Sequence, residues 1–128
     1  MIVKNEEATL PRCLKSVSGV FDEIIIADTG STDGTKQAAA AFTDKIFDFK
    51  WISDFSAARN FSFSKASCDY IMWLDADDVL TAGDREKLLS LKASLTGDED
   101  AVLLPYIAVR DESGKPVFSY YRERIFKR

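Results

Sequence analysis

Histidine is absent from the sequence, and its absence removes several enzyme mechanisms at once. Without an imidazole, the chain can hold no Ser–His catalytic pair, no histidine base and no histidine metal ligand. Cysteine is scarce: Cys13 and Cys68 are the only two, and they form no CxxC pair. Neither a disulfide framework nor a zinc site is therefore expected, and this cysteine usage favours a reducing compartment, so we expect a cytoplasmic protein.

Long apolar runs and an excess of basic residues are also missing. No stretch approaches the ~20 apolar residues of a membrane-spanning helix, and the first residues lack a signal-peptide pattern. Lys and Arg number 17 against 21 Asp and Glu, which gives a net charge of −4. Phosphate backbones attract clustered basic residues, so no nucleic-acid partner is expected. What remains is a chain of 128 residues, 46% of them hydrophobic, which matches one globular domain.

Short apolar runs and helical patterns alternate along the first part of the chain. They predict strands at 1–3, 23–27, 45–49 and 70–74, and helices at 8–19, 35–42, 55–67 and 83–96. This alternation is typical of parallel βαβ units with helices on both faces of the sheet. A turn at 112–116 between two strand patterns predicts a hairpin at the end. We therefore predict an α/β, Rossmann-like fold with a mostly parallel sheet and a mixed or antiparallel tail.

Polar residues directly follow three of the predicted strands. These segments are Lys4-Asn5-Glu6-Glu7, Asp28-Thr29-Gly30-Ser31 and Asp75-Ala76-Asp77-Asp78. Parallel strands end at the same edge of a sheet, and open α/β sheets bind ligands beyond that edge. If the strand at 70–74 is parallel to the others, the three segments face one crevice.

The acidic segment is the first candidate for a binding site. Asp75, Asp77 and Asp78 repel one another unless a cation lies between them. Magnesium or manganese commonly takes one or two carboxylates and completes its shell with substrate phosphates. The pattern therefore predicts a cation site that recruits a diphosphate. Alternatively, these residues cap the next helix or form a solvated loop.

The other two segments and one helix add further candidates. Asp28 closes a buried strand, where an acid can accept hydrogen bonds from a ribose or a base. Gly30 permits a tight turn there, and Ser31 can cap the next helix, so a turn-and-cap role is the alternative. Glu6 suits either a base edge or the first turn of a helix. Arg59 is a bidentate donor suited to phosphate, or an ordinary surface charge.

Four segments together give the sequence a family resemblance. They are Met1-Ile2-Val3-Lys4-Asn5-Glu6-Glu7, the run from Asp28 to Thr35, Asp54-Phe55-Ser56-Ala57-Ala58-Arg59-Asn60, and the run from Trp73 to Asp78. In this order and spacing they resemble family 2 glycosyltransferases of the GT-A fold, in particular a bacterial branch that opens with VKNEE. Members normally carry more apolar residues before the position of Met1 and an acceptor region beyond Arg128. The resemblance therefore implies a single GT-A nucleotide-sugar-binding domain over residues 1–128, truncated at both ends.

The resemblance implies a metal-dependent, inverting hexosyltransferase. The donor would be a nucleotide-diphosphate sugar, with a UDP-sugar favoured, and the acceptor would be an unidentified hydroxyl compound. Glu6 and Asp28 would contact the base, and Arg59 would lie near the pyrophosphate. In the DxD motif Asp75-Ala76-Asp77, Asp77 would bind Mg²⁺ or Mn²⁺ directly and Asp75 would hold the ribose or a metal-bound water. The nucleotide-sugar site would also include Val3, Gly30, Ser31 and Ala76.

An inverting enzyme needs a carboxylate base, which the resemblance places beyond Arg128. We therefore expect these residues alone to be inactive, and the sequence leaves a homodimer open. Two other functions remain as alternatives. One is a non-catalytic nucleotide-sugar-binding module. The other is a phosphatase of the haloacid-dehalogenase type, since Asp75 to Val79 fits its DxDx[TV] signature with Asp75 as nucleophile.

Overall fold

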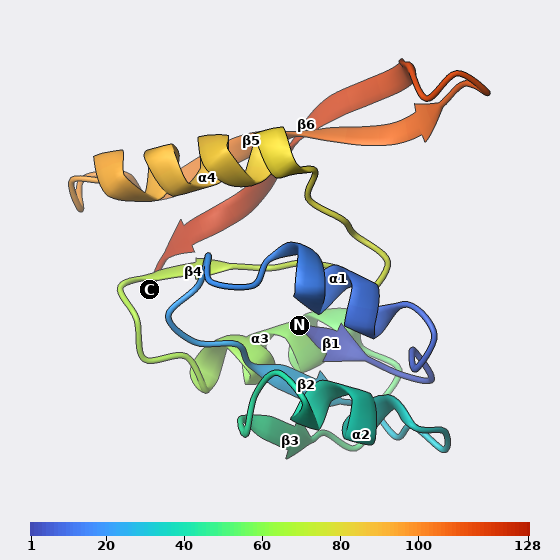
Figure 1. Ribbon diagram of the computed structural model, residues 1–128. Helices are drawn as coiled ribbons and strands as arrows, with labels where there is room; N and C mark the ends of the chain where they lie inside the picture. The colour runs from blue at the N-terminus through green and yellow to red at the C-terminus, as the bar shows by residue number, and fades with distance from the viewer. The chain divides into compact units, whose positions relative to one another are not determined.

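A computed structural model describes residues 1–128, and it separates into two compact units (Figure 1). The N-terminal unit consists of Met1–Cys68 and Leu74–Leu95. The C-terminal unit consists of Asp69–Trp73 and Thr96–Arg128. The single domain expected from the sequence stays a prediction.

The N-terminal unit contains a three-stranded parallel sheet. Its strands are β1 (Ile2–Val3), β2 (Ile26–Asp28) and β3 (Ile46–Asp48), in the order β1-β2-β3. Val3 pairs with Asp28 and Asp28 with Asp48, so the three strands end level with one another. All three residues of β2 are buried, as its apolar run predicts for a central strand. The predicted α/β class is confirmed.

Four helices belong to the same unit. They are α1 (Leu10–Ser16), α2 (Thr35–Ala40), α3 (Phe55–Ser64) and α4 (Ala82–Ser94). All four are shorter than the patterns predict, because turns take over at their ends; after α1 the chain turns at Gly19, which has a φ of +73°. Asp54 caps α3 by accepting a hydrogen bond from the amide of Ala57 at 3.0 Å. No helix combines the length and apolar character that crossing a membrane requires.

Apolar side chains of the helices and strands meet in one core. Its buried members are Val3, Leu10, Leu14, Ile26, Ala39 and Ala76. The two leucines come from α1 and are completely covered, and each such burial contributes about 2 kcal/mol. Since α1 begins three residues after Glu7, this packing also fixes the place of the polar segment before it.

The C-terminal unit is an antiparallel sheet. Its strands are β4 (Tyr70–Met72), β5 (Ala101–Arg110) and β6 (Pro116–Lys127), in the order β4-β6-β5. β5 and β6 form the predicted hairpin. Pro105 lies inside β5 without ending it, because an edge strand has one side where a missing amide costs no ladder bond.

The strand at 70–74 does not join the parallel sheet, so this part of the fold prediction is wrong. β4 pairs antiparallel with β6, from Tyr70 opposite Lys127 to Met72 opposite Ile125. No ladder joins β4 to β1, β2 or β3. A continuous apolar run indicates a buried strand but not its neighbour, and here the neighbour comes from a distant segment of the chain.

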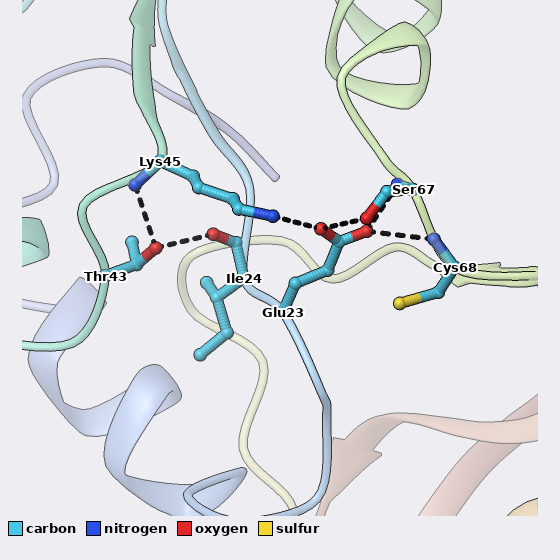
Figure 2. A network of polar contacts seen from close by, with 6 residues as sticks. All are labelled: Glu23, Ile24, Thr43, Lys45, Ser67 and Cys68. Atoms are coloured by element: carbon cyan, nitrogen blue, oxygen red, sulfur yellow. Dashed lines mark hydrogen bonds and ion pairs between the residues drawn. The ribbon is translucent and has the colours of Figure 1, made fainter.

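The parallel ladder also begins later than predicted. The sequence pattern starts a strand at Glu23, whereas β2 starts at Ile26. The carbonyl of Ile24 accepts a hydrogen bond from the Thr43 hydroxyl at 2.8 Å instead of joining a ladder. The Thr43 hydroxyl accepts in turn from the amide of Lys45 at 3.0 Å. These side-chain bonds hold the segment before β2 against the turn before β3 (Figure 2).

The Glu23 carboxylate extends this network to the end of α3 (Figure 2). It accepts hydrogen bonds from the amides of Ser67 at 2.6 Å and Cys68 at 3.2 Å, and from the Ser67 hydroxyl at 3.0 Å. It also pairs with Lys45. The contact with Lys45, followed by the Ser67 amide, lowers the pKa of Glu23 to about 2. One carboxylate thus joins three segments of the N-terminal unit.

Candidate nucleotide-sugar site

Asp28 ends β2 and has only 1% of its surface exposed. Its Oδ1 accepts hydrogen bonds from the amides of Gly30 at 2.9 Å and Ser31 at 2.8 Å. Gly30 takes a φ of +103°, a conformation that favours glycine and turns the chain over the carboxylate. Burial raises the pKa of Asp28, but the hydrogen bonds from Ser31 and Gly30 outweigh burial and the net shift is downward. The carboxylate is therefore ionised at neutral pH.

The other oxygen of this carboxylate is unusual. Oδ2 of Asp28 is the only buried side-chain nitrogen or oxygen atom of the chain without a hydrogen-bond partner. An unpaired buried acceptor costs about 1–3 kcal/mol, and more when it is charged. Nearly all buried polar groups in proteins find a partner, so an exception marks a place where a ligand or a water molecule donates. The turn already occupies Oδ1, which leaves Oδ2 to meet such a donor.

Two of the predicted segments contact each other directly. We call the hydrogen bonds between residues 5–7 and residues 31–35 the loop–loop network. Three consecutive backbone amides of the first segment donate to three side chains of the second. They are Asn5 to Ser31 Oγ at 2.9 Å, Glu6 to Thr35 Oγ1 at 2.7 Å and Glu7 to Asp33 Oδ2 at 3.3 Å. The structure therefore brings together two motifs that are separate in the sequence.

The second segment donates back to the first. Asn5, which has a φ of +55°, accepts a hydrogen bond from the amide of Thr32 at 2.8 Å through Oδ1. Glu7 Oε2 accepts from the amide of Gly34 at 2.6 Å. A Cβ atom at Gly34 would lie 2.6 Å from that oxygen, so a larger residue there would displace the Glu7 carboxylate. The Glu6 side chain is occupied locally, by the hydroxyl of Thr9 at the start of α1.

The acidic segment 75–78 belongs to the N-terminal unit and is held by α1. The Cys13 thiol donates to the carbonyl of Asp75 at 3.5 Å, and the Ser16 hydroxyl accepts from the amide of Leu80 at 3.1 Å. Cys13 is a free, buried cysteine, as expected. Its burial, followed by the charge of Asp78, raises the pKa of the thiol to about 12, so it stays protonated.

Side chains of the acidic segment differ in their surroundings. Asp78 accepts a hydrogen bond from the amide of Asp75 at 3.0 Å, which closes the turn. The Asp75 carboxylate lies 3.7 Å from the guanidinium of Arg59 on α3, and both side chains are about one third exposed. Asp77 is exposed and takes part in neither contact. No three acidic or cysteine side chains converge closely enough to hold a metal ion by themselves.

Two predicted site residues have core side chains. Val3 and Ala76 are buried in the apolar cluster, so only their backbone groups remain for a ligand. The carbonyl of Val3 already accepts from the amide and the hydroxyl of Thr29, at 2.9 and 3.0 Å. Their role at a nucleotide-sugar site stays a prediction.

The residues that hold the candidate site together were not among the site residues predicted from the sequence. Asn5, Asp33 and Thr35 join the two segments, and Cys13 and Ser16 hold the acidic segment. The turn-forming residues at 31–35 indicate turns, but they do not indicate that this segment forms hydrogen bonds with residues 5–7. Neither Glu6 nor Asp28 bonds directly to Asp77; the acidic segment is joined to α1 by hydrogen bonds and to Arg59 on α3 by an ion pair.

The family of the chain follows from comparison with known proteins. The model of glycosyl transferase family 2 matches residues 1–126, and the chain belongs to this family. A TPR repeat-containing protein of Synechococcus elongatus is 38% identical over 128 residues, which are 99% of this chain and 30% of that protein. The SPbeta prophage-derived glycosyltransferase SunS of Bacillus subtilis is 36% identical over 110 residues, which are 84% of this chain and 26% of SunS.

Solved structures of glycosyltransferases share the fold. Glucosyl-3-phosphoglycerate synthase of M. tuberculosis matches 62% of this chain and 33% of its own, with a TM-score of 0.54 and 27% identity. S. aureus TarS 1-349 matches 72% of this chain and 29% of its own, with a TM-score of 0.59 and 22% identity, and shows the fold alone. The predicted family and GT-A fold are confirmed, and the phosphatase alternative is not supported. The chain spans about a third or less of these relatives.

Proposed function

We propose that this chain is the part of a glycosyltransferase that binds the nucleotide-sugar donor, and that the N-terminal unit holds the site. The observation that carries the proposal is the buried Asp28 Oδ2, which lacks a partner in the protein. An N–H of a nucleobase or a hydroxyl of a ribose is the kind of donor that this oxygen requires. Uracil and guanine both present such an N–H, so the preference for a UDP-sugar rests on the family resemblance alone.

Glu6 is proposed as the second contact to the base. Its backbone amide is bonded to Thr35 and its carboxylate to Thr9, so both the segment and the side chain have defined positions. Both Glu6 and Asp28 are acceptors, so each needs a donor of its own from the nucleotide, either a base N–H or a ribose hydroxyl. Ser31 and Gly30 support this arrangement through the turn that holds Asp28.

The acidic segment fits a divalent cation that is shared with the donor. Carboxylate oxygens are the ligands that Mg²⁺ and Mn²⁺ prefer, and Asp77 presents an exposed carboxylate next to Asp75. Because three such side chains do not converge, the remaining ligands would be diphosphate oxygens and water. We propose Asp77 as the direct ligand and Asp75 as its helper. When bound, the cation would neutralise charge on the diphosphate.

Arg59, on α3, is proposed to contact the diphosphate of the donor. Sugar transfer breaks the bond between the anomeric carbon and a phosphate oxygen, so the leaving diphosphate gains negative charge. A guanidinium presents planar donors that match phosphate oxygens, and Arg59 already lies beside Asp75. The acceptor hydroxyl attacks the anomeric carbon and loses its proton to a base, and the resemblance to the family implies inversion at that carbon. No residue of this chain is assigned that role.

Calorimetric titration tests the proposal. UDP, UDP-glucose and GDP-mannose are titrated into the chain with and without Mn²⁺, and into Asp77→Ala and Asp44→Ala. Asp44 is an exposed acid at the turn before β3 and serves as the matched control. We expect UDP and UDP-glucose to bind in the presence of Mn²⁺, and Asp77→Ala to lose at least about tenfold in affinity while Asp44→Ala stays unchanged.

Two results would contradict the proposal in different ways. Equal affinity with and without Mn²⁺, or in Asp77→Ala, would overturn the assignment of the cation site. Absence of binding for every nucleotide would overturn the nucleotide-sugar site itself.

A further inference from the structure

We propose that Thr35 is a positioning residue of the nucleotide site. Its buried hydroxyl sets the place of the segment that carries Glu6 relative to the turn that holds Asp28. The inference rests on the proposed function, because Thr35 would keep Glu6 and Asp28, the two acids proposed to contact the base, in position relative to each other.

The Thr35 hydroxyl is buried and both donates and accepts a hydrogen bond. Thr35 is the first residue of α2 and is completely buried. Its Oγ1 accepts from the amide of Glu6 at 2.7 Å and donates to the carboxylate of Asp33. The Thr35 amide donates to the same Asp33 oxygen at 3.0 Å, which fixes the side chain at the start of the helix. The hydroxyl is thus oriented by Asp33 and presents its acceptor side to Glu6.

Among the amides of residues 5–7, the Glu6 amide is the one whose bond is shielded from solvent. The bonds of the Asn5 amide to Ser31 and the Glu7 amide to Asp33 lie at exposed positions, where water can replace a lost partner. The Glu6 bond to Thr35 is partly buried, so its loss leaves a shielded donor without a partner. The position of the 5–7 segment therefore depends on the bond to Thr35 more than on the other bonds of the loop–loop network.

Movement of the 5–7 segment would reach Asp28 through Ser31. The Ser31 hydroxyl accepts from the amide of Asn5, and the Ser31 amide donates to Asp28 Oδ1. A segment released at Glu6 therefore also loosens the turn that orients the Asp28 carboxylate. The consequence is weaker nucleotide binding rather than a change in the chemical step.

Three variants separate positioning from stability. Thr35→Val keeps the shape of the side chain and removes both hydroxyl bonds, whereas Thr35→Ser keeps the hydroxyl. Thr43→Val is the matched control, because the Thr43 hydroxyl likewise donates one hydrogen bond, here to a backbone carbonyl, and accepts one from an amide, outside the loop–loop network (Figure 2). Asp33→Asn is a second probe that keeps the size of the side chain but alters the acceptor of the Thr35 hydroxyl and of the Glu7 amide.

The experiment combines calorimetry of UDP with Mn²⁺, hydrogen exchange at the Glu6 amide and urea denaturation for each protein. We expect Thr35→Val to weaken UDP binding about tenfold and to speed exchange at Glu6 by a similar factor. Asp33→Asn should change both in the same direction, and Thr35→Ser should restore both. Thr43→Val should lose stability but keep UDP affinity within about threefold.

The outcomes distinguish this inference from the proposed function. If the unaltered chain binds UDP, equal binding by Thr35→Val and Asp33→Asn would overturn the role of Thr35 alone. Equal weakening by Thr43→Val would overturn it as well, because the effect would then follow stability. If the unaltered chain binds neither UDP nor GDP-mannose, the proposed function fails, and the nucleotide role of Thr35 fails with it.

Discussion

Replacing Glu23 by glutamine tests whether one carboxylate joins three segments of the N-terminal unit. Its side chain is only 11% exposed and accepts hydrogen bonds from Ser67 and Cys68 besides its ion pair with Lys45 (Figure 2). Glutamine keeps the shape of the side chain but removes the charge. It also offers an NH₂ group where the carboxylate presents only acceptors.

The magnitude follows from the pKa of this group. One pKa unit corresponds to about 1.4 kcal/mol. A change from 4.5 in the unfolded chain to about 2 in the folded chain therefore corresponds to about 3 kcal/mol at neutral pH. Lys45 is 41% exposed, so solvent screens part of this attraction and we expect about 1–3 kcal/mol. Because the folded pKa is the lower one, the contribution is complete above pH 4.5 and is lost as the pH falls towards 2.

Urea denaturation at pH 7 and at pH 3 measures the effect. The free energy of unfolding of Glu23→Gln should be about 1–3 kcal/mol lower than that of the unaltered chain at pH 7, and the difference should shrink at pH 3. Both proteins share all other carboxylates, so the contribution of those groups cancels in the difference between the two free energies of unfolding. Asp22→Asn is the control, because its ion pair with Lys92 is exposed and should contribute less than about 1 kcal/mol. Equal stability at pH 7, or a difference that does not depend on pH, would refute this reasoning.

Two further substitutions test the packing that positions the site, each by urea denaturation. Leu14→Ala empties a completely covered position of α1 and should lower the free energy of unfolding by about 2–4 kcal/mol; a change below 1 kcal/mol would show that α1 is not anchored there. Asp54→Ala removes the cap of α3 and should cost about 1 kcal/mol, while Asp54→Ser should recover most of it; equal losses in both would argue against the cap.

Local signals in the sequence account for much of the fold. The apolar run before Asp28 predicts a buried strand, and the helical pattern from residue 55 predicts α3, because each depends on residues close in the chain. The partner of β4 could not be predicted, since residues of β6 form that ladder far along the sequence. The same applies to the late start of β2, where the Thr43 hydroxyl competes for the Ile24 carbonyl.

The same distinction between features set by nearby residues and features set by distant residues applies to the candidate site. A polar segment after a buried strand predicts that Asp28 faces a ligand, because strand ends meet at one edge of a sheet. Which of its oxygens remains unpaired depends on the turn formed by Gly30 and Ser31. The contact between Glu6 and Thr35 depends on how two loops pack, and neither loop carries a pattern for the other. Tertiary hydrogen bonds of this kind have no signature in a single sequence.

The most direct test of the central claim is a crystal structure of the chain with UDP and Mn²⁺, together with the UDP affinity of Asp28→Asn. We predict that a donor group of the nucleotide lies within hydrogen-bond distance of Asp28 Oδ2, about 2.7–3.2 Å, and that Asp28→Asn weakens binding by about tenfold or more. UDP bound elsewhere, with Asp28 Oδ2 still unpaired and the affinity of the variant unchanged, would contradict the account.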